Sequence, residues 1–374
     1  MVDFAPAPGD RVLVAMSGGV DSSVAAALLV KQGYDVVGAT MKLFCHDGDL
    51  PDRPCCSLDS VNDARRVCER LGVPHYVLNL ESAFGRDVVD DFVAEYSRGR
   101  TPIPCVRCNT FTKFRDLLHK ADAIDAHWIA TGHYARMVNG VLHRGEDSAK
   151  DQSYFLWGIH RSVLERLLLP VGTLSKPETR AVARELGLLH VADKVESQDI
   201  CFVPDGDHTK IIAQRLGADA PALAPGPIVT EDGEPAGEHQ GFARYTIGQR
   251  RGLPGGYLVP MYVVDIRPES RTVVIGPRDA LLGRGLVARE FNWLGEPART
   301  GQQVQVQVRH RTAPAPAELL RVEGNEVELA LAEPVSAIAP GQSVVLYDGA
   351  RVLGGGVIEV GIRAPRKREL TVIG

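Results

Sequence analysis

A short glycine- and serine-rich segment, SGGVDSS at residues 17–23, has the residue types of an anion-binding loop. Its two glycines allow a tight backbone turn that brings several N–H groups to one point. A helix that follows directly aims the positive end of its dipole at the same place, and the three serine hydroxyls add donors. The segment therefore predicts a site for an anion of the size of pyrophosphate.

The charge of Asp21 is unusual in such an anion site. It favours a Mg²⁺ ion beside the bound phosphates, because carboxylate oxygens are ligands that Mg²⁺ prefers. The segment is not a Walker A loop, since the pattern GxxxxGK[ST] is absent. The alternative interpretation is a strand-to-helix turn in which Ser and Asp merely cap the helix.

Two cysteines, Cys108 and Cys201, lie in segments bounded by residues typical of turns and loops. A thiolate is a strong nucleophile and can carry a sulfane sulfur as a persulfide. Two thiols are the minimum for sulfur delivery without an outside reductant: one bears the persulfide and the other releases the sulfur by forming a disulfide. Cys68, inside an expected helix, is interpreted as a small buried hydrophobe.

Cys105 stands three residues before Cys108 and leaves a second chemistry open. A CxxC pair with one remote cysteine, here Cys201, could hold a [4Fe–4S] cluster with one open iron, and CxxC alone also fits redox chemistry or half a zinc site. Cys45, Cys55 and Cys56 form another group in an Asp-, Gly- and Pro-rich loop, for which zinc binding and plain loop thiols are both open.

The elements that must position these groups alternate in the first half of the chain. Strands are expected over residues 11–15, 35–43 and 75–80, which are apolar and rich in β-branched residues, and helices over 22–32 and 57–72, each followed or closed by glycine. This order predicts a parallel sheet with helices on both faces, a class that binds ligands at the carboxyl ends of its strands.

The pattern changes near residue 217. Residues 218–237 are crowded with Pro, Gly and acidic residues, which indicates a linker or long loop. Short runs of period 2 follow, such as VQVQV at 304–308, and predict a small antiparallel barrel or sandwich. We expect an N-terminal domain over 1–216, a linker with a small central domain over 217–284, and a C-terminal β-barrel over 285–374.

Length, composition and net charge limit the kind of protein this can be, but they do not decide its function. The 374 residues suffice for two or three domains, and 24% of them are charged. No stretch approaches the roughly 18 apolar residues of a membrane span, and no signal peptide is recognised, so we expect a cytoplasmic protein with reduced cysteines. The net charge of −5 leaves RNA binding open, because RNA needs only a local basic face.

The SGGVDSS segment resembles the loop of the PP-loop ATP pyrophosphatases. That resemblance implies ATP, with Mg²⁺, cleaved between its α- and β-phosphates and AMP transferred to a substrate oxygen. The implied ATP-binding residues are Ala15, Met16, Ser17, Gly18, Gly19, Val20, Asp21, Ser22, Met41 and Gly132.

Three further segments, ATGHYAR (130–136), KDQSYFL (150–156) and GFARYTIGQRRGL (241–253), extend the likeness over nearly the whole chain. Together they resemble the bacterial tRNA-specific 2-thiouridylases. In that family the cysteine before Asn, here Cys108, is the nucleophile that ends in a disulfide. The cysteine before Phe, here Cys201, holds the persulfide.

The resemblance also implies the target and the partners. The target is the wobble uridine of tRNAs for Lys, Glu and Gln, and the sulfur comes from a sulfur-relay donor protein or a cysteine desulfurase. Candidate tRNA contacts are His133, Lys150, Asp151, Gln152, Arg309, Arg311 and Gln342, and a purely structural role for His133 is equally open. Basic clusters at residues 250–251, 309–311 and 366–368 could contact the tRNA backbone.

One departure from the family pattern concerns Cys105. The family commonly has Asn-Pro-Asp where this chain has Ile103-Pro104-Cys105, so an Asp suggested as general acid/base is missing. Cys105 could carry the proton instead, since a thiol with a pKa near ~8.5 titrates. Two rival functions stay open: a PP-loop ligase acting on a small molecule, and a non-catalytic tRNA-binding protein.

Overall fold

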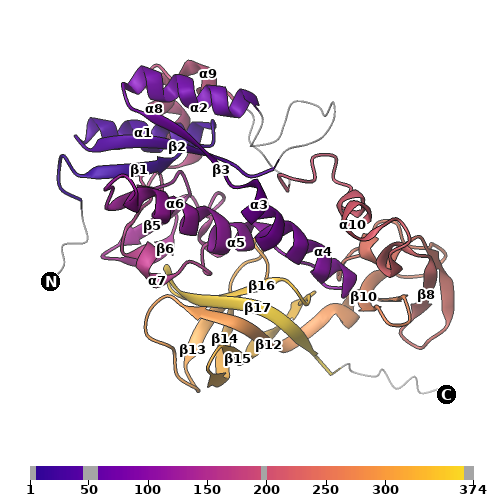
Figure 1. Ribbon diagram of the computed structural model, residues 1–374. Coiled ribbons are helices and arrows are strands. Elements are labelled where there is room, and N and C mark those ends of the chain that lie inside the picture. The colour runs from indigo at the N-terminus through magenta and orange to yellow at the C-terminus, as the bar shows by residue number, and fades with distance from the viewer. Residues whose placement is uncertain (1–5, 45–57, 195–199, 366–374) are drawn as a thin grey trace.

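The computed structural model describes residues 6–44, 58–194 and 200–365 (Figure 1). The N-terminal part is built on a parallel sheet of order β3-β2-β1-β4-β7. Its strands are β1 (Arg11–Ala15), β2 (Asp35–Lys42), β3 (His75–Asn79), β4 (Trp128–Ala130) and β7 (Leu167–Leu168). The predicted parallel sheet is confirmed, and its strand order reverses between β1 and β4.

Helices cover both faces of the sheet because side chains of a strand alternate between the faces. Val12 and Val14 of β1 pack with the helices of one face, whereas Leu13 packs with α6 on the other. All three side chains are fully buried. The covering helices are α1 (Val20–Lys31), α2 (Leu58–Leu71), α6 (Phe114–Asp122), α8 (Lys176–Glu185) and α9 (Leu189–Ala192).

Two helical runs lie below the sheet in Figure 1. One is made of α3 (Glu81–Phe84), a π-helical turn η1 (Gly85–Val89) and α4 (Asp90–Ser97). The other is made of α5 (Pro104–Arg107), a π-helical turn η2 (Cys108–Lys113) and α6. Cys108 therefore lies inside a helical run and not in the expected loop. Tertiary packing overrides the weak helix propensity of Cys, Val and Thr here, since Val106, Phe114 and Leu117 are all buried.

The central part is a small sheet of order β10-β11-β8-β9 that follows α10 (Thr209–Leu216). Its strands are β8 (Gly226–Thr230), β9 (Pro235–His239), β10 (Tyr262–Arg267) and β11 (Thr272–Gly276). The linker expected over 218–237 was thus wrong in part, because β8 and the start of β9 lie within it. Gly233 turns the hairpin with a φ of +86°, and buried Ile228 anchors it.

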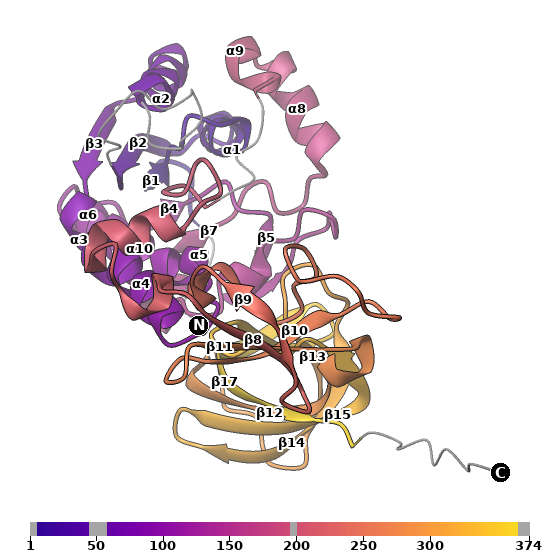
Figure 2. The same cartoon turned by 90° about the vertical axis from the view of Figure 1, so that its right-hand side faces the viewer.

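The C-terminal part is a closed barrel of six antiparallel strands, as expected. The order is β12-β15-β14-β13-β16-β17, and pairing of β12 with β17 closes it. The strands are β12 (Leu282–Trp293), β13 (Gln303–Gln307), β14 (Ala315–Glu323), β15 (Glu326–Ser336), β16 (Ser343–Asp348) and β17 (Arg351–Arg363). Figure 2 shows the barrel and the central strands beneath the N-terminal part.

A hairpin from the N-terminal part joins the barrel. It consists of β5 (Ala135–Val138) and β6 (Val141–Arg144), and β6 pairs with β17. At Gly355 of β17 a Cβ would lie 2.6 Å from the ring of Trp157, so only glycine allows this approach. The remaining short helices are η3 (Ser153–Phe155), α7 (Arg161–Leu164), η4 (Pro221–Leu223), η5 (Phe242–Arg244) and η6 (Arg278–Leu281).

Within the described ranges, no helix combines the length and the apolar character that crossing a bilayer would need.

Candidate functional site

The SGGVDSS segment forms a tight loop between β1 and α1. The Ser22 hydroxyl accepts from the backbone N–H of Ser17 at 3.1 Å and lies 3.0 Å from the Ser17 hydroxyl, so the loop closes on itself. Gly18 has a φ of +71°, and a Cβ there would lie 2.1 Å from the carbonyl oxygen of Ser60. Only glycine fits this position, which explains why the first glycine is needed.

A second loop, which follows β4, packs directly against the first. At Gly132 a Cβ would lie 2.5 Å from the backbone nitrogen of Ser22. The two loops therefore meet where the strand order reverses between β1 and β4, which is where open parallel sheets bind their ligands. The structure brings the predicted Gly132 to the predicted anion loop.

The carboxylate of Asp21 is paired with a lysine that the sequence reasoning did not single out. Lys176 Nζ lies 2.8 Å from Asp21 Oδ1 and 2.9 Å from Oδ2. The Tyr134 hydroxyl donates to the same Oδ1 at 2.8 Å. Lys176 is buried, with 7% of its surface exposed. A protein cation thus compensates the Asp21 charge, so this charge alone does not require Mg²⁺.

Lys176 is placed by the start of α8. Ser175 and Glu178 form a reciprocal capping box, and Pro177 occupies the first turn. The segment SKPE is a recognisable helix start in the sequence, so the position of Lys176 at the first helical residue could have been predicted. Its pairing with Asp21 could not, because that depends on how α8 packs against α1.

A cavity of about 330 Å³ joins the anion loop to all three predicted catalytic cysteines. Residues from the carboxyl ends of β1, β2 and β4 line one end of it, and α5, η2, α6 and the segment at residues 200–202 line the other. Among its lining residues are Ala15, Met16, Ser17, Asp21, Ser22, Met41, Cys105, Cys108, Lys113, Gly132, His133, Gln152 and Cys201. The predicted anion-binding residues and the predicted catalytic cysteines therefore line the same cavity.

The three cysteines differ in exposure. Cys105 is exposed, Cys108 is buried with 5% of its surface exposed, and Cys201 is half-buried. Phe202 holds the Cys201 segment, because its buried ring lies 5.6 Å from the ring of Phe84 and 5.1 Å from that of Phe92. Over the described residues no three His, Cys, Asp or Glu side chains are grouped to hold a metal ion, so the expected three-cysteine cluster is not supported.

His133 lies in the cavity wall as a neutral imidazole. Burial and the nearby charge of Lys113 lower its pKa to about 3. Its Nδ1 lies 2.8 Å from the Thr131 hydroxyl. A neutral, hydrogen-bonded ring in the cavity suits contact with a nucleobase better than contact with a phosphate.

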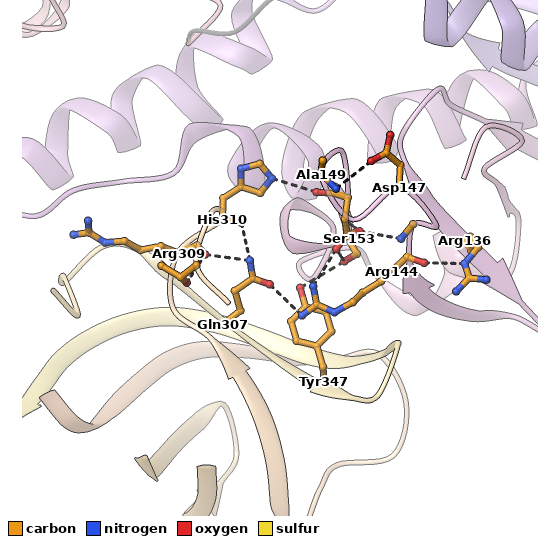
Figure 3. A network of polar contacts seen from close by, with 12 residues as sticks. Arg136, Arg144, Asp147, Ala149, Ser153, Gln307, Arg309, His310 and Tyr347 are labelled. Atoms are coloured by element: carbon orange, nitrogen blue, oxygen red, sulfur yellow. Dashed lines mark hydrogen bonds and ion pairs between the residues drawn. The ribbon is translucent and has the colours of Figure 1, made fainter. Parts of the chain in front are cut away.

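The KDQ segment, residues 150–152, is held by hydrogen bonds of the network in which Figure 3 labels Arg144 and Ser153. Asp151 accepts from the backbone N–H groups of Gly145 and Ser153 at 3.0 Å each, and Arg144 lies 3.1 Å from its Oδ2. Gln152 reaches the cavity and accepts from the backbone N–H of Tyr134 at 2.9 Å. The segment therefore has a structural role, because it holds Gln152, which lines the cavity, against the backbone of Tyr134.

The predicted basic residues of the barrel have unequal surroundings. Arg309 is half-buried and donates to the carbonyl oxygen of Ile247 at 2.7 Å, and burial lowers its pKa. Arg311 is exposed. Gln342 donates to the carbonyl oxygen of Thr101 at 2.9 Å and so ties the barrel to the segment before α5.

Some predicted groups lie outside the described residues. They are Cys45, Cys55, Cys56 and the basic run 366–368. The pair Arg250–Arg251 is described and exposed, in a loop of the central part that ends at β10.

Family models cover nearly the whole chain. A model described as the tRNA methyl transferase HUP domain matches residues 10–205. A model described as the tRNA methyl transferase PRC-barrel domain matches residues 213–277, and one described as an aminomethyltransferase beta-barrel domain matches residues 283–358. The three matches correspond to the parallel sheet, the central sheet and the closed barrel.

Curated relatives match over almost their full length. The tRNA-specific 2-thiouridylase MnmA of Rhodospirillum centenum is 50% identical over 371 residues, which cover 95% of this chain and 93% of that one. The protein of the same name from Carboxydothermus hydrogenoformans is 48% identical, covering 93% and 97%. That from Rhodospirillum rubrum is 47% identical, covering 94% and 97%.

Proposed function

Because this chain belongs to the tRNA-specific 2-thiouridylase family, we propose that it replaces the 2-oxygen of the wobble uridine of tRNA with sulfur. The chain is a tRNA-uridine 2-sulfurtransferase with a PP-loop fold that uses ATP. The base position, the tRNA species and the chemical steps below are the proposal. The observation that carries it is the single cavity shared by the anion loop and three cysteines.

The first step is activation of the base. The 2-oxygen of uridine attacks the α-phosphorus of ATP, an O–P bond forms, and pyrophosphate leaves. The loop N–H groups and serine hydroxyls of residues 17–23 bind the pyrophosphate end, and the Asp21–Lys176 ion pair lies beside them. Mg²⁺ bound with ATP would neutralise phosphate charge, and Asp21 is the residue of the loop whose carboxylate could hold it.

The second step is sulfur transfer. The terminal sulfur of a Cys201 persulfide attacks C2 of the adenylated uridine, and AMP leaves with the former 2-oxygen. The Cys108 thiolate then attacks Cys201 Sγ, which breaks the S–S bond, leaves the sulfur on C2 and forms a Cys108–Cys201 disulfide. The two cysteines line one cavity, which supports their pairing. An outside thiol must reduce the disulfide before the next turnover.

Cys105 takes the proton-carrier role in this proposal. It is exposed, lines the cavity and lies one helical turn before Cys108. Protonation and deprotonation of its thiol match the general acid/base role expected of the family's Asp at this position.

The partners of the proposal are a tRNA for Lys, Glu or Gln and a protein that supplies the sulfur. The exposed Arg250, Arg251 and Arg311 are the described positions best suited to phosphate contacts. Cys201 is half-buried, so a donor must reach it through the cavity mouth before tRNA covers that opening.

Pyrophosphate release from ATP, measured with and without bulk tRNA, tests the proposal. We expect release that depends on tRNA, and 2-thiouridine in the recovered tRNA by mass spectrometry when a persulfide donor is present. Release that needs only a small molecule would favour the PP-loop ligase instead.

A further inference from the structure

Tyr134 is a buried residue that connects the anion loop, residues 17–23, to the segment contacted by the barrel. It follows His133, and 3% of its surface is exposed. Its hydroxyl donates to Asp21 Oδ1 at 2.8 Å and lies 2.9 Å from the Thr179 hydroxyl. Its ring centroid lies 5.6 Å from Lys176 Nζ. One side chain therefore contacts both members of the Asp21–Lys176 pair, by a hydrogen bond to the anion and by its ring face to the cation.

The backbone of Tyr134 is bound to the KDQ segment. Its N–H donates to the side-chain oxygen of Gln152 at 2.9 Å, and the N–H of Gln152 donates back to its carbonyl oxygen at 2.8 Å. At Gly145 a Cβ would lie 2.8 Å from that same carbonyl oxygen. The position of Tyr134 is thus set by the segment that carries Gln152.

The barrel in turn holds that segment (Figure 3). Arg144 lies 3.1 Å from Asp151 Oδ2 and donates at 3.1 Å to the side-chain oxygen of Gln307 on β13. The His310 ring, just past β13, lies 3.2 Å from the carbonyl oxygen of Asp151. Gln307 is 4% exposed and donates to the carbonyl oxygen of His310 at 2.7 Å. Gln307 thereby holds His310 in place, and the barrel contacts the loop segment through Arg144 and through the carbonyl oxygen of Asp151.

We propose that Tyr134 is a positioning residue that sets the Asp21–Lys176 pair for adenylation, in a geometry that the barrel imposes through Asp151 and Gln152. The proposal rests on the proposed function, because it concerns the ATP-using step. When tRNA binds the barrel, hydrogen bonds of 2.8–3.2 Å would transmit the position of the barrel to the anion loop, with Tyr134 as the connecting residue.

The test is a double-mutant cycle of Tyr134→Phe and Gln307→Ala, read as the rate of pyrophosphate release at saturating ATP and tRNA. Tyr134→Phe keeps the ring and removes the hydrogen bond to a charged group, so we expect a fall of about tenfold or more. Gln307→Ala should lower the rate at least about threefold in the wild-type background and by less than about twofold beside Tyr134→Phe.

The controls separate positioning from folding. Tyr96→Phe is the matched change at another buried tyrosine, and Gln305→Ala is the matched change at an exposed glutamine of the same strand. Both should keep the wild-type rate, and the tRNA dissociation constant should stay unchanged for Tyr134→Phe. Thermal unfolding midpoints, measured for the same cycle, report the coupling without catalysis and should also be non-additive.

Equal effects of Gln307→Ala in both backgrounds would overturn the proposal, as would a Tyr134→Phe variant with the wild-type rate. Wild-type protein that releases no pyrophosphate would count against the proposed function, and the unfolding cycle would then decide on the coupling.

Discussion

Lys176 Nζ contacts both carboxylate oxygens of Asp21, at 2.8 and 2.9 Å, although the two residues belong to different helices. The lysine side chain is 9% exposed and that of the aspartate 32% exposed. The anion loop therefore contains a half-buried ion pair with an almost buried cation. Removing one partner has a different consequence from removing both, because a single charge left behind is poorly solvated.

We expect Asp21→Ala to abolish pyrophosphate release and also to lower the free energy of unfolding by about 1–3 kcal/mol, because it removes the carboxylate that compensates the buried Lys176 ammonium. Adding Lys176→Met should restore much of the stability but no activity. Chemical denaturation and a pyrophosphate assay check the two effects. Normal thiolation by Asp21→Ala would contradict the assignment of the loop.

Cys108→Ser and Cys201→Ser should each stop thiolation and leave tRNA-dependent pyrophosphate release intact, because neither residue belongs to the anion loop. The matched control is Cys68→Ser, a buried cysteine away from the cavity whose replacement affects stability alone. Full thiolation by Cys201→Ser with inorganic sulfide would refute an obligatory persulfide.

Cys105→Asp restores the common family residue and should retain thiolation, since a carboxyl group can carry the same proton. Cys105→Ala should lower the rate, because neither a thiol nor a carboxyl group then remains at this position. The rate of single-turnover thiolation, measured from about pH 6 to about pH 9, checks both variants. Equal rates for Cys105→Ala and the wild type would remove Cys105 from the mechanism.

His133 should make the protein acid-sensitive. Its pKa is about 3 when folded and 6.5 as the ordinary value, so the unfolded chain binds the proton first as the pH falls. Stability from this group is fully present above pH 6.5 and is lost as the pH falls toward 3, at up to about 1.4 kcal/mol per pH unit. His133→Gln should flatten the dependence of unfolding free energy on pH in that window; an unchanged slope would show that His133 titrates normally.

Arg309 and Arg311 should respond differently to alanine substitution. Arg311→Ala removes an exposed charge, so tRNA binding should weaken and the slope of log K against log salt should fall by about 1. Arg309→Ala should chiefly lower the unfolding midpoint, because its side chain bonds to Ile247 across the domain contact. Filter binding at several salt concentrations and thermal unfolding distinguish them. A salt-independent affinity of the wild type would argue against tRNA as the substrate.

Several features were predictable because their signals are local. The glycines and serines of residues 17–23 determine a turn and a helix start through their own backbone and hydroxyl groups, so β1, the loop and α1 appear where expected. Period-2 runs after residue 285 predicted the barrel strands for the same reason, because alternation is a property of the strand itself. The expected loop around Cys108 failed, because packing on the sheet makes weak helix formers helical.

Other features depend on contacts between distant segments, which no local signal contains. Asp21 and Lys176 come from the starts of two helices, and their pairing follows from the packing of α1 and α8 on one face of the sheet. Tyr134 is bound to the segment that carries Gln152, which in turn contacts His310 beside the barrel strand β13. Sequence alone determined which residues could do the chemistry and the local structure of the anion loop. Only the tertiary structure decided which side chains meet, because meeting depends on how buried surfaces from the whole chain pack together.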